Sequence, residues 1–218
     1  MKKPSPLAIT LTILAVITGA LVALSGFYVD WLWFNSVGFT DVWTTVLTTK
    51  VALFVIAGLL TSLIISLNVY LAFRRRPFYV PTSIEADNLE RYRTTIDPIR
   101  KLVFAGIVLV LFYFGGTSAT NLWSSWLLFR NSTEFGVQDP QFGLDISFFA
   151  FRLPFWQTLI GWGISTLILA TLASAAVHYL YGGIRPQVPQ ERTTVAARVQ
   201  LSVLLGLIVL LKAAAYWF

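Results

Sequence analysis

Long apolar stretches alternate with short polar ones along this chain, and these stretches predict its main elements. The clearest is Val51 to Phe73, VALFVIAGLLTSLIISLNVYLAF, which carries no charged side chain and ends against Arg74, Arg75 and Arg76. A helix needs about 20 apolar residues to cross about 30 Å of hydrocarbon, and an arginine at the centre of that hydrocarbon costs about 2.5–3.5 kcal/mol. The stretch therefore predicts a membrane-spanning helix whose end is marked by the three arginines.

Further apolar stretches have the same character, and together they predict an all-α, polytopic transmembrane helix bundle of about five spans. We expect the spans at roughly residues 7–29, 46–73, 99–123, 154–181 and 195–218. The first follows Met1-Lys-Lys, as the apolar region of a secretory signal would, but it is longer than the 7–15 residues of such a region. A retained first span is therefore favoured over a cleaved leader.

Helix-start signals lie at several of the polar junctions. Asp97-Pro98 is typical of the beginning of a helix and precedes the third span, and Thr193 or Thr194 is placed to cap the fifth. Thr82 and Glu85 have the spacing of a capping box, which predicts a short helix over about residues 83–93.

Composition supports the membrane assignment. Hydrophobic residues make up 56% of the 218 residues, charged residues only 12%, and the mean hydropathy is +0.73. A soluble domain carries about 25% charged residues, so this chain could not cover a core of its size with polar side chains. It contains no cysteine, which excludes disulfides, thiolate catalysis and cysteine-ligated metal sites.

Basic residues alternate between the two sides that these spans define. One side holds Lys2, Lys3, Arg74, Arg75, Arg76, Arg91, Arg93, Arg100, Lys101, Arg185, Arg192 and Arg198. The other side holds only Arg130 and Arg152, together with Lys50 and Lys212 near the ends of their spans. The positive-inside rule then predicts a cytoplasmic N-terminus and a multi-pass protein of the bacterial plasma (inner) membrane.

The net charge of +6 would suggest nucleic acid as a partner if the protein were soluble, but here anionic lipids explain it more simply. The predicted partners are a lipid bilayer with anionic lipids and other membrane proteins, and no nucleic acid. The candidate contacts for lipid headgroups or partners are Arg74, Arg75, Arg76, Arg100 and Lys101. The simpler alternative is a solvated loop whose charges only set the topology.

The connection between the third and fourth spans is rich in aromatic residues and is broken by Gly136, Asp139-Pro140 and Gly143. These breakers argue against a helix that crosses the membrane, and the aromatic residues predict a loop that lies in the interface or packs over helix ends. Asp139 and Asp145 could together ligate a cation. Turn and cap chemistry is the favoured interpretation, because both lie beside proline or glycine turn signals.

Few polar residues in the spans could carry chemistry. His178 is the only histidine, and a headgroup contact is favoured for it over a ligand or proton-relay role. No catalytic pair and no cofactor motif is visible, so we expect a protein that is not an enzyme and has no cofactor. A polar cavity between span two (Thr61, Ser62, Asn68) and span four (Thr166, Thr171) would indicate transport, whereas direct packing of these residues on Gly or Ala would favour a scaffold.

Two stretches resemble one family of uncharacterised bacterial membrane proteins, UPF0182. WFNSVGF at residues 33–39, followed by VWT at 42–44, is similar to a motif after that family's first span. DPQFGLDISFF at 139–149, followed by FRLPF at 151–155, is similar to a second motif, in the same order and at a similar spacing. The resemblance covers nearly the whole chain.

The resemblance implies a large multi-spanning protein with an extracytoplasmic region beyond residue 218, and a loop at 139–155 that packs beneath that region. It supplies no catalytic or ligand residues. The predicted function is therefore a non-enzymatic scaffold or a subunit of an envelope membrane complex, and the alternative is a transporter, channel or lipid-handling component.

Overall fold

The computed structural model describes residues 5–77, 97–186 and 192–217, and these are almost entirely helical. Five of its segments are long and apolar enough to cross a membrane: α1 (Pro6–Ser36), α2 (Thr40–Arg74), α4 (Arg100–Thr120), Phe148–Leu180 and α7 (Val195–Trp217). The predicted all-α fold with five spans is thereby confirmed. The chain divides into two compact units, Met1–Thr49 and Lys50–Phe218.

The first unit contains α1 and the beginning of α2. The Ser5 hydroxyl accepts a hydrogen bond from the Ala8 backbone N–H at 3.3 Å, and Pro6 occupies the first turn, where its missing N–H costs nothing. Helix α1 continues to Ser36, beyond residue 29, where the first span was expected to end. It turns into α2 at Gly38, whose φ of 76° is a left-handed conformation that glycine adopts without strain.

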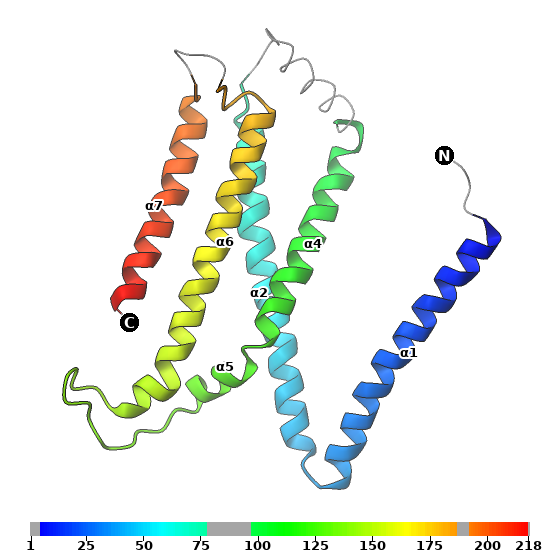
Figure 1. The fold of residues 1–218 in the computed structure, drawn as a ribbon, viewed down its shortest axis with the longest axis vertical. Coiled ribbons are helices and arrows are strands. Elements are labelled where there is room, and N and C mark those ends of the chain that lie inside the picture. The colour runs from blue at the N-terminus through cyan, green and yellow to red at the C-terminus, as the bar shows by residue number, and fades with distance from the viewer. Residues whose placement is uncertain (1–4, 78–96, 187–191, 218) are drawn as a thin grey trace. The chain divides into compact units, whose positions relative to one another are not determined.

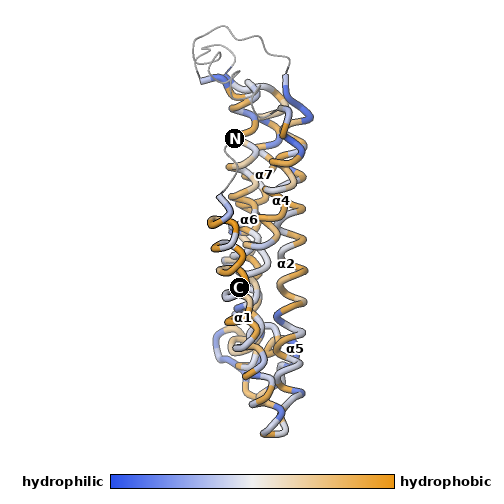
Figure 2. The backbone as a smooth tube through the Cα atoms, turned by 90° about the vertical axis from the view of Figure 1, so that its right-hand side faces the viewer, coloured by the Kyte–Doolittle hydropathy of each residue, from blue (hydrophilic) through white to orange (hydrophobic). Residues whose placement is uncertain are grey.

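The second unit contains the rest of α2, then α4, the short helix α5 (Trp123–Arg130), the π-helical turn η2 (Phe148–Arg152), α6 (Leu153–Leu180) and α7. Its long helices alternate in direction, so α2 and α6 end at the same side at which α4 and α7 begin (Figure 1). The helices are mostly hydrophobic along their lengths, and the most hydrophilic segments lie towards their ends (Figure 2).

The helix starts partly follow the sequence signals. Thr194 caps α7, because its hydroxyl accepts from the Ala197 backbone N–H at 3.3 Å. Asp97–Ile99 forms a 3-10 turn, η1, and α4 begins one residue later. The third span is shorter than expected, because its chain turns after Thr120 and continues as α5. The helix predicted near residues 83–93 lies outside the described residues.

Among the described residues, the buried interior of the second unit contains mainly small and polar side chains, together with the large apolar Ile65, Ile160 and Leu204. The buried face of α6 repeats every four residues as Thr166, Ala170, Ser174 and His178, all exposed by 3% or less. Many large apolar side chains point outward, for example Leu102 at 75% and Leu172 at 62% exposure. This arrangement suits a lipid solvent, in which burying a leucine gains little and close backbone approach stabilises helix contacts.

Helices α2 and α4 cross at three glycines. A Cβ atom on Gly58 would lie 2.6 Å from the Phe112 carbonyl oxygen, and one on Gly115 would lie 2.6 Å from the Cβ of Thr61. A Cβ on Gly116 would lie 2.7 Å from Phe54. The Thr61 side chain therefore packs directly against glycine, and its hydroxyl is the one buried side-chain polar atom without a hydrogen-bond partner among the described residues.

We expect Gly115→Ala to lower the free energy of unfolding by about 1–3 kcal/mol, because the added methyl group overlaps Thr61. Gly106→Ala on the same helix is the matched control, since a Cβ there meets nothing within 4 Å. That control should be neutral or stabilise by up to about 1 kcal/mol through helix propensity. Denaturant titration in detergent micelles measures both variants, and equal effects would contradict a close crossing at Gly115.

Candidate functional site

The five basic residues singled out in the sequence lie at one end of the second unit. Arg74 is the last residue of α2, Arg75 and Arg76 follow it, and Arg100 and Lys101 open α4. All five side chains are exposed. The structure thus brings together on one side cations that are separated by a connection of more than 20 residues.

Two of these arginines stack on one aromatic ring. The guanidinium carbon of Arg76 lies 4.0 Å from the ring centre of Phe73, and that of Arg100 lies 5.7 Å from the same centre. The Phe73 ring also meets the Tyr181 ring edge-on, with centroids 5.1 Å apart, and Arg76 lies 5.3 Å from the Tyr181 ring centre. We call these four side chains the Phe73 platform.

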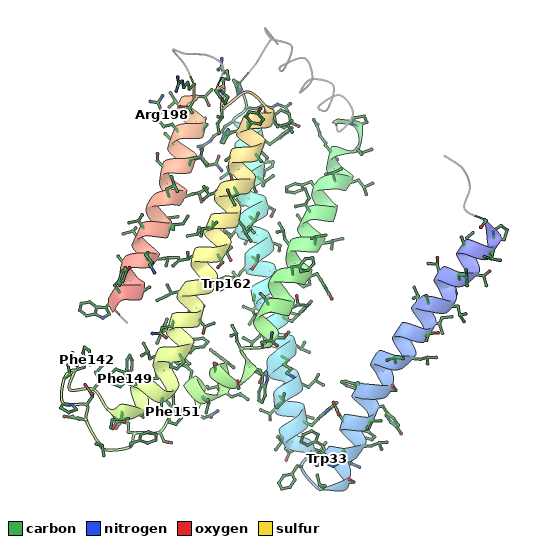
Figure 3. The ribbon with its side chains drawn as sticks, viewed as in Figure 1. Trp33, Phe142, Phe149, Phe151, Trp162 and Arg198 are labelled. Atoms are coloured by element: carbon green, nitrogen blue, oxygen red, sulfur yellow. The ribbon has the colours of Figure 1, made fainter. Side chains whose placement is uncertain are left out.

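The connection from α6 to α7 adds further arginines to the same end. Its backbone is held by bonds from Arg185 N–H to the Arg192 carbonyl at 2.7 Å and from Thr194 N–H to the Gly183 carbonyl at 2.9 Å. The Arg185 side chain donates from Nε to the Gly182 carbonyl at 2.9 Å. Arg198, on the first turn of α7, lies at this end as well (Figure 3).

A buried polar network lies below this end, between three helices. The side-chain nitrogen of Gln200 in α7 lies 2.9 Å from the backbone carbonyl oxygen of Asn68 in α2 and 3.3 Å from its side-chain oxygen. The same nitrogen lies 3.4 Å from the Ser174 hydroxyl in α6. The Gln200 side-chain oxygen faces Nε2 of His178 at 3.1 Å. One glutamine therefore joins α2, α6 and α7.

The sequence interpretation of His178 as a headgroup contact is wrong, because the side chain is buried inside the unit and only 1% exposed. Since the Gln200 oxygen can only accept, Nε2 of His178 carries the proton and donates. The turn after α6 covers the other ring nitrogen: a Cβ on Gly183 would lie 2.8 Å from Nδ1. Two contacts thus fix the imidazole inside the helix bundle.

Gln200 and Ser174 were not singled out in the sequence, although a signal for Gln200 was present. It is an amide in an apolar span, about one and a half turns from the basic end, and Asn68 lies at a comparable distance from the end of α2. In alternating helices such positions share one depth. Asn68 therefore pairs with Gln200, and Thr61, which the sequence offered for a polar cavity or for direct packing on a small residue, packs on Gly115.

The two aspartates of the aromatic loop bind their own backbone. Asp145 accepts N–H bonds from Phe135 at 3.1 Å, Gly136 at 2.8 Å and Ser147 at 2.8 Å. Asp139 accepts from the N–H groups of Gln141 at 3.0 Å and Phe142 at 2.8 Å. The turn-and-cap interpretation is thereby confirmed.

These bonds also change the acidity of the loop. Hydrogen bonds from the Ser147 side chain and then from backbone N–H groups lower the pKa of Asp145 from 3.8 to about 2. Within the described residues, no three His, Asp or Glu side chains group in a way that could hold a metal ion.

Apolar side chains cover the outside of this loop. Phe142 is 64% exposed and its ring is tilted against that of Phe149. Phe135 is 52% exposed and its ring packs edge-on against that of Phe151. Figure 3 shows Phe142, Phe149 and Phe151 gathered at the end of the unit opposite Arg198. The second unit therefore has one basic end and one aromatic end.

Comparison with known proteins gives one consistent result. The family model described as "Uncharacterised protein family (UPF0182)" matches residues 7–218. UPF0182 proteins of Streptomyces coelicolor and Thermobifida fusca are 46% and 48% identical over 97% and 94% of this chain. A UPF0182 protein of Rhodococcus opacus is 42% identical over 95% of it. The chain spans about a fifth of the length of these relatives, and no solved structure matches it.

We expect Gln200→Leu to lower the free energy of unfolding by about 1–3 kcal/mol, because it leaves buried partners on α2 and α6 without their bonds. Gln157→Leu is the matched control, since Gln157 is exposed on α6. It should change the value by no more than about 0.5 kcal/mol. Denaturant titration in micelles measures both, and a neutral Gln200→Leu would contradict a stabilising network.

We expect Asp145 to titrate near pH 2 in the folded protein, as read from its side-chain carboxyl ¹³C shift. Because its pKa falls on folding, its contribution to loop stability is full above about pH 4 and is lost as the pH falls towards 2. Ser147→Ala should raise this pKa. Ser132→Ala, which removes a bond to Arg152 instead, should not. An Asp145 pKa of 3.8 in the unmodified protein would contradict the hydrogen bonds to its carboxylate.

Proposed function

This chain belongs to the uncharacterised protein family UPF0182, and from that premise we propose that it is a non-enzymatic membrane scaffold, the membrane-embedded part of an envelope complex. The membrane is the bacterial plasma membrane, with the basic end of the second unit and the N-terminus in the cytoplasm. The positive-inside rule supports this orientation, because the basic end carries most of the cationic side chains.

The use of polar side chains inside the spans is the observation that carries this proposal. Gln200 bonds to α2 and α6 within the bundle, and Thr61 packs against Gly115 without an intervening space. Transport sites at the membrane midplane need ionisable groups or broken helices that face a path. Here these polar groups hold helices together, which is what a rigid anchor requires.

The aromatic end supplies the docking surface in this proposal. Its side chains Phe135, Val137, Phe142, Leu144 and Ile146 are all more than 40% exposed. The bonds to Asp139 and Asp145 fix the loop before any partner arrives, so little conformational entropy is lost on docking. We propose that this loop contacts protein, either a partner or another region of a longer chain.

One observation favours transport or lipid handling as a second candidate. His178 is an ionisable side chain buried within a span, and such residues often mark ion or substrate paths. In the scaffold proposal this histidine only holds helices together. In that case His178 contributes to the stability of the protein and takes no part in transport across the membrane.

Purification of the native protein in gentle detergent, followed by mass spectrometry, tests the proposal. We expect a stoichiometric membrane complex, and a photo-crosslinker placed at Phe142 should capture a subunit of it or a distant segment of the same chain. The same crosslinker at Phe114 is the control, because the two side chains are equally exposed, 64% and 65%, but Phe114 lies on α4 among lipid-facing residues. It should capture lipid.

A lone protein that carries only lipid, with lipid crosslinks at both positions, would contradict the scaffold and favour the second candidate. Flux measured in proteoliposomes and abolished by Gln200→Leu, in a protein that remains folded, would establish it.

A further inference from the structure

We propose that the Phe73 platform is a binding site for the phosphate headgroup of an anionic phospholipid, held between the ends of α2, α4 and α6. The proposal is independent of the scaffold function. It rests on the arrangement of Arg76 and Arg100 around one ring and on the apolar surface next to them.

The guanidinium groups of Arg76 and Arg100 have the Phe73 ring as a common neighbour. Both lie within 5.7 Å of the centre of the Phe73 ring, and both side chains are exposed. A guanidinium that stacks on a ring keeps its N–H donors around its rim, where they match the oxygen atoms of a phosphate. Stacking also limits the rotamers of long side chains, so less entropy is lost when a phosphate binds.

The position of the platform favours a lipid over free phosphate. Within about two turns of these arginines, α2 exposes Leu67 and Tyr70, by 49% and 48%. The first residues next to and within α4 expose Ile99 and Leu102, by 50% and 75%. A phospholipid bound at the platform would lay its acyl chains on these surfaces, whereas a free phosphate would leave them unused.

The charge of this end favours an anionic lipid over a zwitterionic one. In the sequence, residues 74–101 and 182–198 carry ten basic residues and five acidic ones. Basic clusters between spans at the cytoplasmic side are typical contacts of anionic headgroups. Tyr181, the residue that follows α6, adds a third segment to the site, since its ring packs edge-on against Phe73 and lies 5.3 Å from the Arg76 guanidinium carbon.

Native mass spectrometry of the full-length protein, titrated with phosphatidylglycerol, tests the site, with phosphatidylcholine as the zwitterionic reference. We expect retained phosphatidylglycerol in the unmodified protein and about 100-fold weaker binding in R76Q/R100Q, from a loss of about tenfold for each charge-assisted hydrogen bond to the phosphate. The charge-matched control R192Q/R198Q removes two exposed arginines of the same end that are not part of the platform, and it should lose much less of the bound lipid.

A third variant separates the site from general attraction. Phe73→Leu keeps every charge but removes the ring, and we expect it to weaken binding about two- to fivefold. Thermal unfolding in detergent verifies that each variant is folded. Equal losses in the two arginine pairs would overturn the site in favour of diffuse surface attraction. Displacement of the lipid by an equal concentration of inorganic phosphate would overturn a lipid ligand.

Discussion

The packing of the second unit depends on the side-chain amide of Gln200. Its nitrogen bonds to Asn68 and Ser174 and its oxygen to His178, so one residue of α7 fixes the depth of α2 and α6. In hydrocarbon no water can replace these bonds, and hydrophobic burial does little to press helices together. Specific polar contacts therefore determine which parts of the helices meet.

The glycine crossing of α2 and α4 complements this network. Hydrogen bonds define a register at one level, near the basic end, whereas Gly58 and Gly115 allow the backbones to meet further along. The cost is visible at Thr61, whose buried hydroxyl has no partner in the described part of the chain. Dispersion between closely packed backbones outweighs one unpaired hydroxyl here, since many atoms gain contacts at once.

The sequence predicted the number and approximate positions of the spans, because hydropathy and the alternation of basic residues act over whole segments. It also indicated the turn chemistry of Asp139 and Asp145, which depends on neighbouring residues only. The position of His178 was not predictable in this way. Its burial depends on Gln200, 22 residues away, and on the Gly183 turn that closes over it. Contacts between helices depend on the face of the helix and the depth in the membrane at which each residue lies. A hydropathy profile averages over several turns and does not contain this information.

The inside-out distribution of side-chain sizes has a consequence for how this protein tolerates sequence change. In a water-soluble domain, buried Leu, Ile and Phe tolerate substitution poorly, whereas Ser, Thr and Gly on the surface tolerate it well. Here many large residues face outward, as Leu102 and Leu172 do, and one apolar side chain can replace another at these positions. The positions least tolerant of a larger side chain are therefore small ones, such as Gly58, Gly115 and Ser174, where another helix lies in close contact.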